Sequence, residues 1–304
     1  MEENAPCRLV VYLAREAPIG VVLRRGPSAW VRLSVWHTDT DAFEHGQWFK
    51  GRVYERRCDV SADGSLFVYF ARKTKARILA AHHADSWVAI SRPPWFTALA
   101  LWWVGSTYCA GGYFPDRRPP SAGGDFGQPS GNAASPKAQA LWIGGSQPPA
   151  QGRLPSWLAL TTHVPYVDRT ISWSERTVYV NRLLRDGWQP VPQAPVDTWE
   201  RRHPHRPLTL AMTHAGFDYG TYGVEYAVRT EPQAEAIPLG RATWADWDQR
   251  GRLVIARGGR LFSWQAAGTL QELADFNQQV PAPAPAPAWA RAWPEGTQDK
   301  PASP

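Results

Sequence analysis

The chain has 304 residues, of which 43% are hydrophobic, and it carries a formal net charge of +6 at pH 7. That length allows one large domain or two small ones, and the apolar fraction is sufficient for a core. The 17 tryptophans, 25 glycines and 28 prolines favour short strands joined by tight turns and argue against a helical bundle.

The positive charge is dispersed along the chain. Arginines occur in separated pairs, such as Arg24–Arg25 and Arg201–Arg202, so no basic face is indicated and we do not expect nucleic-acid binding. Cys7, Cys58 and Cys109 are widely spaced and form no Cys-x-x-Cys motif, which argues against a disulfide framework and a structural zinc site. They are typical of reduced cysteines in a cytoplasmic protein. Because no run of about 18 apolar residues occurs, we expect no membrane span and no membrane partner.

The first part of the chain predicts a succession of short strands, over residues 9–14, 21–23, 30–36 and 43–48. Polar or Gly/Pro turns separate them about every ten residues, which is typical of an all-β protein. The pattern continues with predicted strands over residues 87–91, 96–103, 157–162, 171–173, 177–184, 208–213, 222–229, 253–257 and 260–264. Asp186-Gly187 is a hairpin candidate, and helices are expected only over 76–84 and 269–276.

Two segments are low in complexity. Residues 115–136 contain mainly Arg, Pro, Gly, Ser and Asn, and predict a long flexible loop. Residues 281–304 begin with alternating Pro and Ala and predict a disordered, polyproline-like tail. No linker divides the rest, so we expect one domain over residues 1–280.

A turn-and-strand unit occurs twice, at residues 58–70 and 245–256. In both copies an Asp stands five residues before a Gly, at Asp59 and Gly64 and at Asp246 and Gly251, and an apolar strand follows. A degraded third copy is expected at residues 172–180. A repeated hairpin of this kind favours an array of small sheets over stacked β-sandwiches.

The run Val60-Ser61-Ala62-Asp63-Gly64-Ser65-Leu66-Phe67-Val68-Tyr69-Phe70 resembles the Ser-Pro-Asp-Gly repeat of bacterial TolB-type, WD40-like propellers. Ala62 replaces the usual Pro, and the second copy has Arg250 in place of the Asp. The resemblance covers about 35 residues and implies no catalytic residue. Blades of roughly 40 to 50 residues then predict a β-propeller of five or six blades with a disordered C-terminal tail.

Several groups of polar residues could form a site, and each has a structural alternative. Asp59, Asp63, Asp246 and Asp248 could bind calcium, but turn caps are the simpler interpretation. His203 and His205 could bind a metal, but they lie in an arginine-rich segment that would repel a cation. No Gly-x-Ser-x-Gly motif or phosphate-binding glycine loop occurs, so we expect no catalytic triad, metal or cofactor.

The leading functional hypothesis is therefore a non-enzymatic scaffold that binds another protein, whose identity the sequence does not indicate. Buried aromatic and arginine anchors dominate many interfaces, which makes Trp102, Trp103, Arg201, Arg202 and Arg206 the candidate contact residues. Most of the tryptophans are expected in the core. The first alternative is an enzyme acting on a small molecule or sugar in the propeller channel. The second is a nucleic-acid binder, which requires the arginines to gather on one face. Two or more carboxylates or histidines converging at the channel would favour the enzyme.

Overall fold

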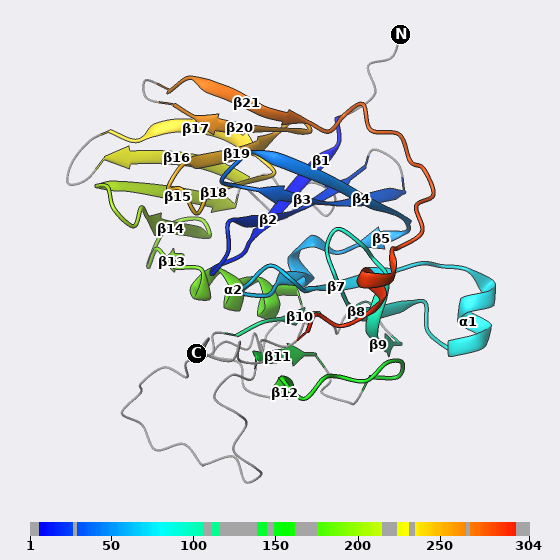
Figure 1. Cartoon of the computed structure of the whole chain (residues 1–304). Helices are drawn as coiled ribbons and strands as arrows, with labels where there is room; N and C mark the ends of the chain where they lie inside the picture. The colour runs from blue at the N-terminus through cyan, green and yellow to red at the C-terminus, as the bar shows by residue number, and fades with distance from the viewer. Residues whose placement is uncertain are drawn as a thin grey trace, which may run out of the picture.

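The computed structural model describes residues 6–26, 29–105, 107, 111–115, 139–144, 149–161, 175–214, 224–230, 235–265 and 268–295. Within these ranges the strands form five sheets, numbered here in chain order (Figure 1). Sheet 1 is an antiparallel meander of β1 Arg8–Leu13, β2 Ile19–Arg25, β3 Trp30–His37 and β4 Ala42–Lys50. Sheet 2 consists of β5 Arg52–Val53, β6 Asp59–Val60, β7 Phe67–Arg72, β8 Ser86–Ser91 and β9 Ala98–Val104.

The remaining three sheets follow in the second half of the chain. Sheet 3 contains β10 Gly112–Tyr113, β11 Gln139–Ile143 and β12 Leu158–Thr161, and its β11–β12 pair is parallel. Sheet 4 contains β13 Gln189–Pro190, β14 Thr198–Arg202, β15 Leu208–His214, β16 Val224–Thr230 and β17 Ile237–Ala242. Sheet 5 contains β18 Trp244–Trp247, β19 Leu253–Arg257, β20 Arg260–Trp264 and β21 Leu270–Asp275. The helices are α1 Ala76–His82, α2 Glu175–Arg185, η1 Glu55–Arg57 and η3 Ala288–Arg291.

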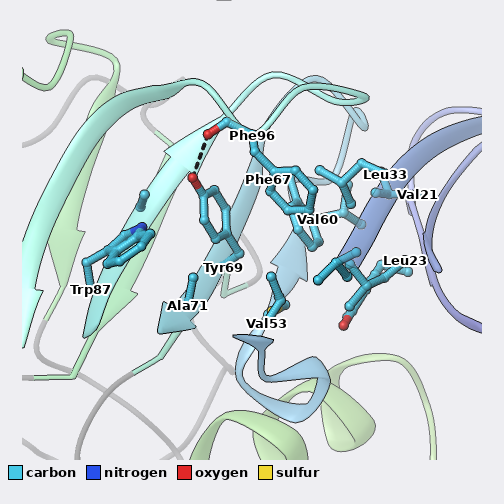
Figure 2. Packing of buried hydrophobic residues seen from close by; sticks show 14 of the residues in the cluster. Val21, Leu23, Leu33, Val53, Val60, Phe67, Tyr69, Ala71, Trp87 and Phe96 are labelled. Atoms are coloured by element: carbon cyan, nitrogen blue, oxygen red, sulfur yellow. Dashed lines mark hydrogen bonds between the residues drawn. The ribbon is translucent and has the colours of Figure 1, made fainter. Parts of the chain in front are cut away.

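The central strands of sheets 2 and 5 are apolar on both faces, and this determines how these sheets pack. In β7, Phe67, Tyr69 and Ala71 lie in one hydrophobic cluster with sheet 1, whereas Val68 and Phe70 lie in another with sheet 3. Successive side chains of a strand point to opposite faces, so one strand serves two interfaces. Figure 2 shows the interface of sheets 1 and 2, where the Tyr69 hydroxyl donates to the Phe96 carbonyl at 2.6 Å.

The same alternation continues around the molecule. In β19, Val254 and Ala256 pack with sheet 1, whereas Leu253 and Ile255 pack with sheet 4. Strand β1 of sheet 1 contacts sheet 5, so the first and the last sheet of the chain are neighbours. Helix α2 lies between sheets 3 and 4, because Val178 packs on sheet 3 and Leu183 packs in the cluster of sheet 4. The described chain is thus an all-β protein, a propeller of five successive blades, as the sequence predicted. One helix, α2, is inserted into the ring.

Two predicted elements were wrong in type. Residues 177–184 were expected to be a strand, and residues 172–180 a third repeat, but Glu175–Arg185 is helix α2. Its β-branched and aromatic residues favour a strand locally, yet Val178 and Leu183 are buried by the two sheets on either side, and this packing overrides propensity. Conversely, the predicted helix at 269–276 is the edge strand β21, which pairs with β20. Residues 171–174 lie outside the described residues.

The C-terminal segment differs from the predicted disorder as far as the structure describes it. Residues 281–295 lie along the outside of sheets 1 to 3. The Gln47 side chain donates to the Ala284 carbonyl at 3.2 Å, and Arg92 donates to the Trp289 carbonyl at 2.9 Å. Trp293 packs edge-on against Trp157. These contacts give residues 281–295 apolar and polar partners elsewhere in the chain, which the amino-acid composition of the segment did not indicate. Residues 296–304, and the predicted flexible loop from residue 116 to 136, lie outside the described residues.

The two repeat copies form the same turn in different sheets. Gly64 lies between β6 and β7, Gly251 lies between β18 and β19, and their φ angles are +78° and +71°. Each glycine N–H donates to the carbonyl three residues earlier, Ser61 at 3.0 Å and Asp248 at 2.9 Å. A Cβ at either position would also lie within about 3.0 Å of a neighbour, Ile19 or His203. Glycine is therefore required at both turns.

We predict that Gly64→Val and Gly251→Val each lower the free energy of unfolding by about 1–3 kcal/mol, because both the backbone and the neighbouring side chain are strained. Urea unfolding followed by circular dichroism measures the change. Gly105→Val is the matched control, since a Cβ there meets nothing within 4 Å and φ is not positive. Unchanged stability in both turn variants would refute the equivalence of the two turns.

Candidate functional site: the central cavity

In four of the five sheets one hairpin is closed by the same hydrogen bond: β1–β2, β6–β7, β14–β15 and β18–β19. The donor amides are those of Ala14, Ser61, His203 and Asp248, which donate to carbonyls four or five residues later at 2.8–2.9 Å. Two residues before these donors stand Tyr12, Asp59, Arg201 and Asp246. Side chains two residues apart on a strand share a face, so these four positions are equivalent. All four line one cavity of about 390 Å³, the central cavity.

The central cavity is lined by residues of sheets 1, 2, 4 and 5 and of α2. Its walls come from the end of β1, from β6, from α2 and the residues after it, from sheet 4 and from β18. The charged side chains that line it are four arginines and four aspartates: Arg15, Arg182, Arg185, Arg201, Asp59, Asp186, Asp246 and Asp248. Its aromatic residues are Tyr12, Tyr179, Tyr226, Trp188, Trp244 and Trp247. The lining therefore combines balanced charge with large apolar faces.

Arg185, at the end of α2, holds two carboxylates. Its guanidinium forms ion pairs with Asp59 and Asp186, and it also donates to the Phe114 carbonyl at 2.7 Å. The Asp59 side chain is fully buried and also accepts from the Phe114 amide at 2.9 Å. These bonds join sheet 2, sheet 3 and α2 at one point. Gly187, at φ +90°, allows the chain to leave the helix here.

A second group surrounds Asp246 in sheet 5. Its carboxylate forms an ion pair with Arg201 of sheet 4 and accepts from the Trp247 amide at 2.8 Å. The indole N–H of Trp188 donates to the other carboxylate oxygen at 3.3 Å. The side chains of Arg201 and Asp246 remain 24% and 12% exposed, so both have surface within reach of a molecule in the cavity.

The environments of Asp186 and Asp246 shift their pKa values in opposite directions. Burial raises the pKa of Asp246, and the Arg201 charge opposes this rise only in part. Burial also acts to raise the pKa of Asp186, but the charge and hydrogen bonds of Arg185 outweigh it, so this pKa is lowered. Two carboxyl groups whose pKa values are separated in one cavity can act as a proton donor and an ionised partner.

Tyr179 connects the cavity to a polar chain on sheet 4. Its hydroxyl lies 3.3 Å from Nε2 of His214, whose Nδ1 lies 3.4 Å from the Asp197 carboxylate. Burial and then the Arg56 charge lower the pKa of His214, which favours the neutral imidazole. The guanidinium of Arg56 lies 4.7 Å from the centre of the Tyr179 ring. These contacts fix the orientation of Tyr179 at the cavity wall.

The turn aspartates divide into two kinds. Asp63 and Asp248 cap their turns as expected, for Asp63 accepts from the Ser65 amide at 3.0 Å and Asp248 accepts from the Arg252 amide at 2.8 Å. For Asp59 and Asp246 the turn-cap interpretation was wrong, because these side chains line the central cavity in ion pairs. Among the described residues no group of three His, Cys, Asp or Glu side chains could hold a metal ion.

The candidate histidines and cysteines have structural partners. Nδ1 of His203 accepts from the amides of His205 and Arg206, each at 2.9 Å, and Nε2 lies 2.9 Å from the Gly251 carbonyl. His203 thus joins the hairpins of sheets 4 and 5. Cys7 and Cys58 are buried and free. Burial raises the pKa of Cys58 to about 12, so its thiol is not ionised near neutral pH.

The five candidate contact residues do not form one surface. Trp102 is 5% exposed and packs between sheets 2 and 3, whereas its neighbour Trp103 is partly buried and stacks on His82 at 4.0 Å. Arg201 lines the central cavity, while Arg202, at the end of β14, and Arg206, on the loop that follows β14, are exposed. Sequence reasoning missed the cavity residues Tyr12, Arg182, Arg185 and Trp188. Tyr12 and Arg201 occupy positions equivalent to Asp59 and Asp246, but the sequence reveals this equivalence only after the hairpins have been aligned.

No helix in the described residues is long and apolar enough to cross a membrane. No family model matches the chain, and no curated protein matches it. Solved structures with some similarity include the GH43 protein BlXynB from Bacillus licheniformis, at 9% identity and TM-score 0.33, covering 92% of this chain and 56% of that chain. Another is the uncharacterized protein lmo1340 from Listeria monocytogenes EGD-e, at 9% identity and TM-score 0.29, covering 92% and 86%. The chain thus spans little more than half the length of BlXynB, and no activity follows from similarities this low.

We predict that Asp59→Ala and Arg185→Ala each reduce the free energy of unfolding by about 3–5 kcal/mol. Asp59→Ala removes one of the two carboxylates that compensate the buried Arg185, and Arg185→Ala leaves the buried Asp59 without a cation. Chemical denaturation measures the change. Glu225→Ala is the control, since it removes a pair with Arg241 whose side chains are 54% and 73% exposed. That variant should change stability by less than about 1 kcal/mol. Equal effects in all three variants would contradict the role assigned to the buried pair.

Proposed function

We propose that this protein binds a small, neutral, hydroxyl-rich molecule, such as a sugar, in the central cavity. The observation that carries the proposal is the convergence of Tyr12, Asp59, Arg201 and Asp246, from four different sheets, on one cavity of about 390 Å³. That volume suits a small molecule. Side chains that converge on a cavity indicate a ligand site in the propeller channel, whereas a scaffold would present its contact residues on its surface.

The chemistry of the lining supports this class of ligand. Arginines supply hydrogen-bond donors and aspartates supply acceptors, and a hydroxyl group can use both. Because the four arginines balance the four aspartates, the cavity offers no excess charge to an ionic ligand. Trp188, Trp244 and Trp247 supply flat apolar surfaces of the kind that pack against the C–H face of a sugar ring.

Acid–base chemistry on the bound molecule is the second candidate function. It is favoured by the opposite pKa shifts of Asp186 and Asp246 in one cavity, which suit Asp246 for proton donation and Asp186 for the ionised role. A turnover that is lost in Asp246→Asn while ligand binding is retained would support this step. Loss of binding and turnover together would assign Asp246 to binding alone.

The scaffold hypothesis has weaker support, because Trp102, Trp103 and Arg201 do not share a surface with Arg202 and Arg206. The nucleic-acid alternative has weaker support at the central cavity, because the four arginines there are balanced by four aspartates. Two further predictions remain proposals. One is that residues 60–70 belong to a TolB-type repeat. The other is a cytoplasmic location, which is supported by the buried free thiols of Cys7 and Cys58.

We predict that neutral saccharides raise the melting temperature of the wild-type protein, because a ligand that binds only the folded state stabilises it. The measurement is thermal unfolding with glucose, galactose, lactose, maltose and cellobiose, compared with glucuronate and glucose 6-phosphate. Arg201→Gln should abolish the rise. Arg206→Ala is the matched control, since Arg206 is exposed on the same loop, and it should preserve the rise.

Two outcomes would overturn the proposal. The first is that no neutral saccharide changes the melting temperature of the wild type. The second is that the charged sugars act as strongly as the neutral ones. If, in addition, combined Arg201→Ala, Arg202→Ala and Arg206→Ala substitution removes a protein partner in a pull-down, the scaffold hypothesis would be favoured instead.

A further inference from the structure

Three of the five lysines of the chain lie close together next to the ends of β4 and β7. Lys50 ends β4, and Lys73 and Lys75 lie in the short segment between β7 and α1. Strand β5 pairs with β7, which brings Arg52 opposite Arg72 and joins the two segments. The pKa of Lys73 is lowered by partial burial and then by the charges of Lys75 and Lys50. We call Lys50, Lys73, Lys75 and Arg52 the lysine face.

The lysine face has little negative charge to balance it. The nearby carboxylate of Asp85 already binds Arg72 at 2.7 Å and accepts from Thr74 at 3.2 Å. In the described part of the chain, no ion pair joins a carboxylate to Lys50, Lys73 or Lys75. An uncompensated group of cations on a surface favours an anionic partner.

Aromatic rings lie beneath these cations. The ammonium of Lys50 lies 5.6 Å from the Trp30 ring centre, and that of Lys73 lies 5.4 Å from the Phe49 ring centre. Trp103 is covered in turn by the imidazole of His82 at 4.0 Å. Because these rings are already covered by cations and an imidazole, they do not form a free platform on which nucleic-acid bases could stack.

Helix α1 adds an apolar element next to the lysine face. Figure 1 shows it, in cyan, at the edge of the molecule beyond β7 and β8. Its side chain Leu79 is 50% exposed, and the neighbouring Ala80 and Ala81 are also exposed. A short apolar helix flanked by lysines is the combination by which proteins bind the interface of an anionic bilayer.

We propose that the lysine face docks on the surface of an anionic lipid bilayer, with Leu79 inserted at the headgroup boundary. The lysines contact the lipid phosphates, and each cation near the surface adds to the attraction. The contact is peripheral and uses no spanning segment. It goes beyond the proposed function of the central cavity, and it adds a partner where the sequence predicted no membrane contact.

The test is co-sedimentation of the full chain with vesicles of phosphatidylcholine alone and of phosphatidylcholine and phosphatidylglycerol in equal amounts. The wild type should bind the anionic vesicles and not the neutral ones, and added salt should weaken binding. Combined Lys50→Glu, Lys73→Glu and Lys75→Glu substitution should weaken binding at least about tenfold. Leu79→Ser should weaken it at unchanged charge.

The matched control is combined Arg229→Glu, Arg241→Glu and Arg260→Glu substitution, which reverses the same number of charges on sheets 4 and 5. It should bind as the wild type does, provided that circular dichroism shows each variant to be folded. Equal binding loss in control and lysine variants would overturn the proposal, as would binding to neutral vesicles. Lysine-dependent binding of a single-stranded oligothymidine without vesicle binding would assign the face to nucleic acid instead.

Discussion

The ion pair between Asp59 and Arg185 is the constraint on which the interior depends. Asp59 comes from the short strand β6 of sheet 2, and Arg185 ends a helix more than a hundred residues later. Both side chains are almost completely removed from water, so the loss of either one leaves a buried charge with less compensation. The amide and carbonyl of Phe114 complete the group from sheet 3. This one group therefore fixes α2 in the ring and places Asp186 and Trp188 beside the central cavity.

Around that point, the ring forms because the central strands of sheets 2 and 5 are apolar on both faces. A strand such as β7 or β19 cannot leave either face in water, so sheet 2 packs between sheets 1 and 3, and sheet 5 packs between sheets 1 and 4. Tyr12, Asp59, Arg201 and Asp246 line the central cavity, which is therefore polar although the interfaces between the sheets are apolar.

Most of the architecture could be predicted from local patterns. The hairpin turns at Gly64 and Gly251 are encoded by adjacent residues, and so are the strands of sheet 1. The failures occurred where distant packing decides the structure. Residues 175–185 have strand-forming side chains but are buried as a helix between two sheets, and residues 270–275 have helix-forming side chains but pair with β20. The cavity was missed for the same reason, since its partners are joined by contacts such as Asp59–Arg185 and Arg201–Asp246, which no short segment reveals.

The central claim is that equivalent inner positions of different sheets form one binding site. The most direct measurement is a crystal structure of the protein with the saccharide that raises its melting temperature most. The account predicts the sugar between Arg201, Asp246 and the residues after α2, with hydroxyl groups bonded to charged side chains and one ring face on a tryptophan. A sugar bound only at the outer surface, with no contact to the central cavity, would contradict the account.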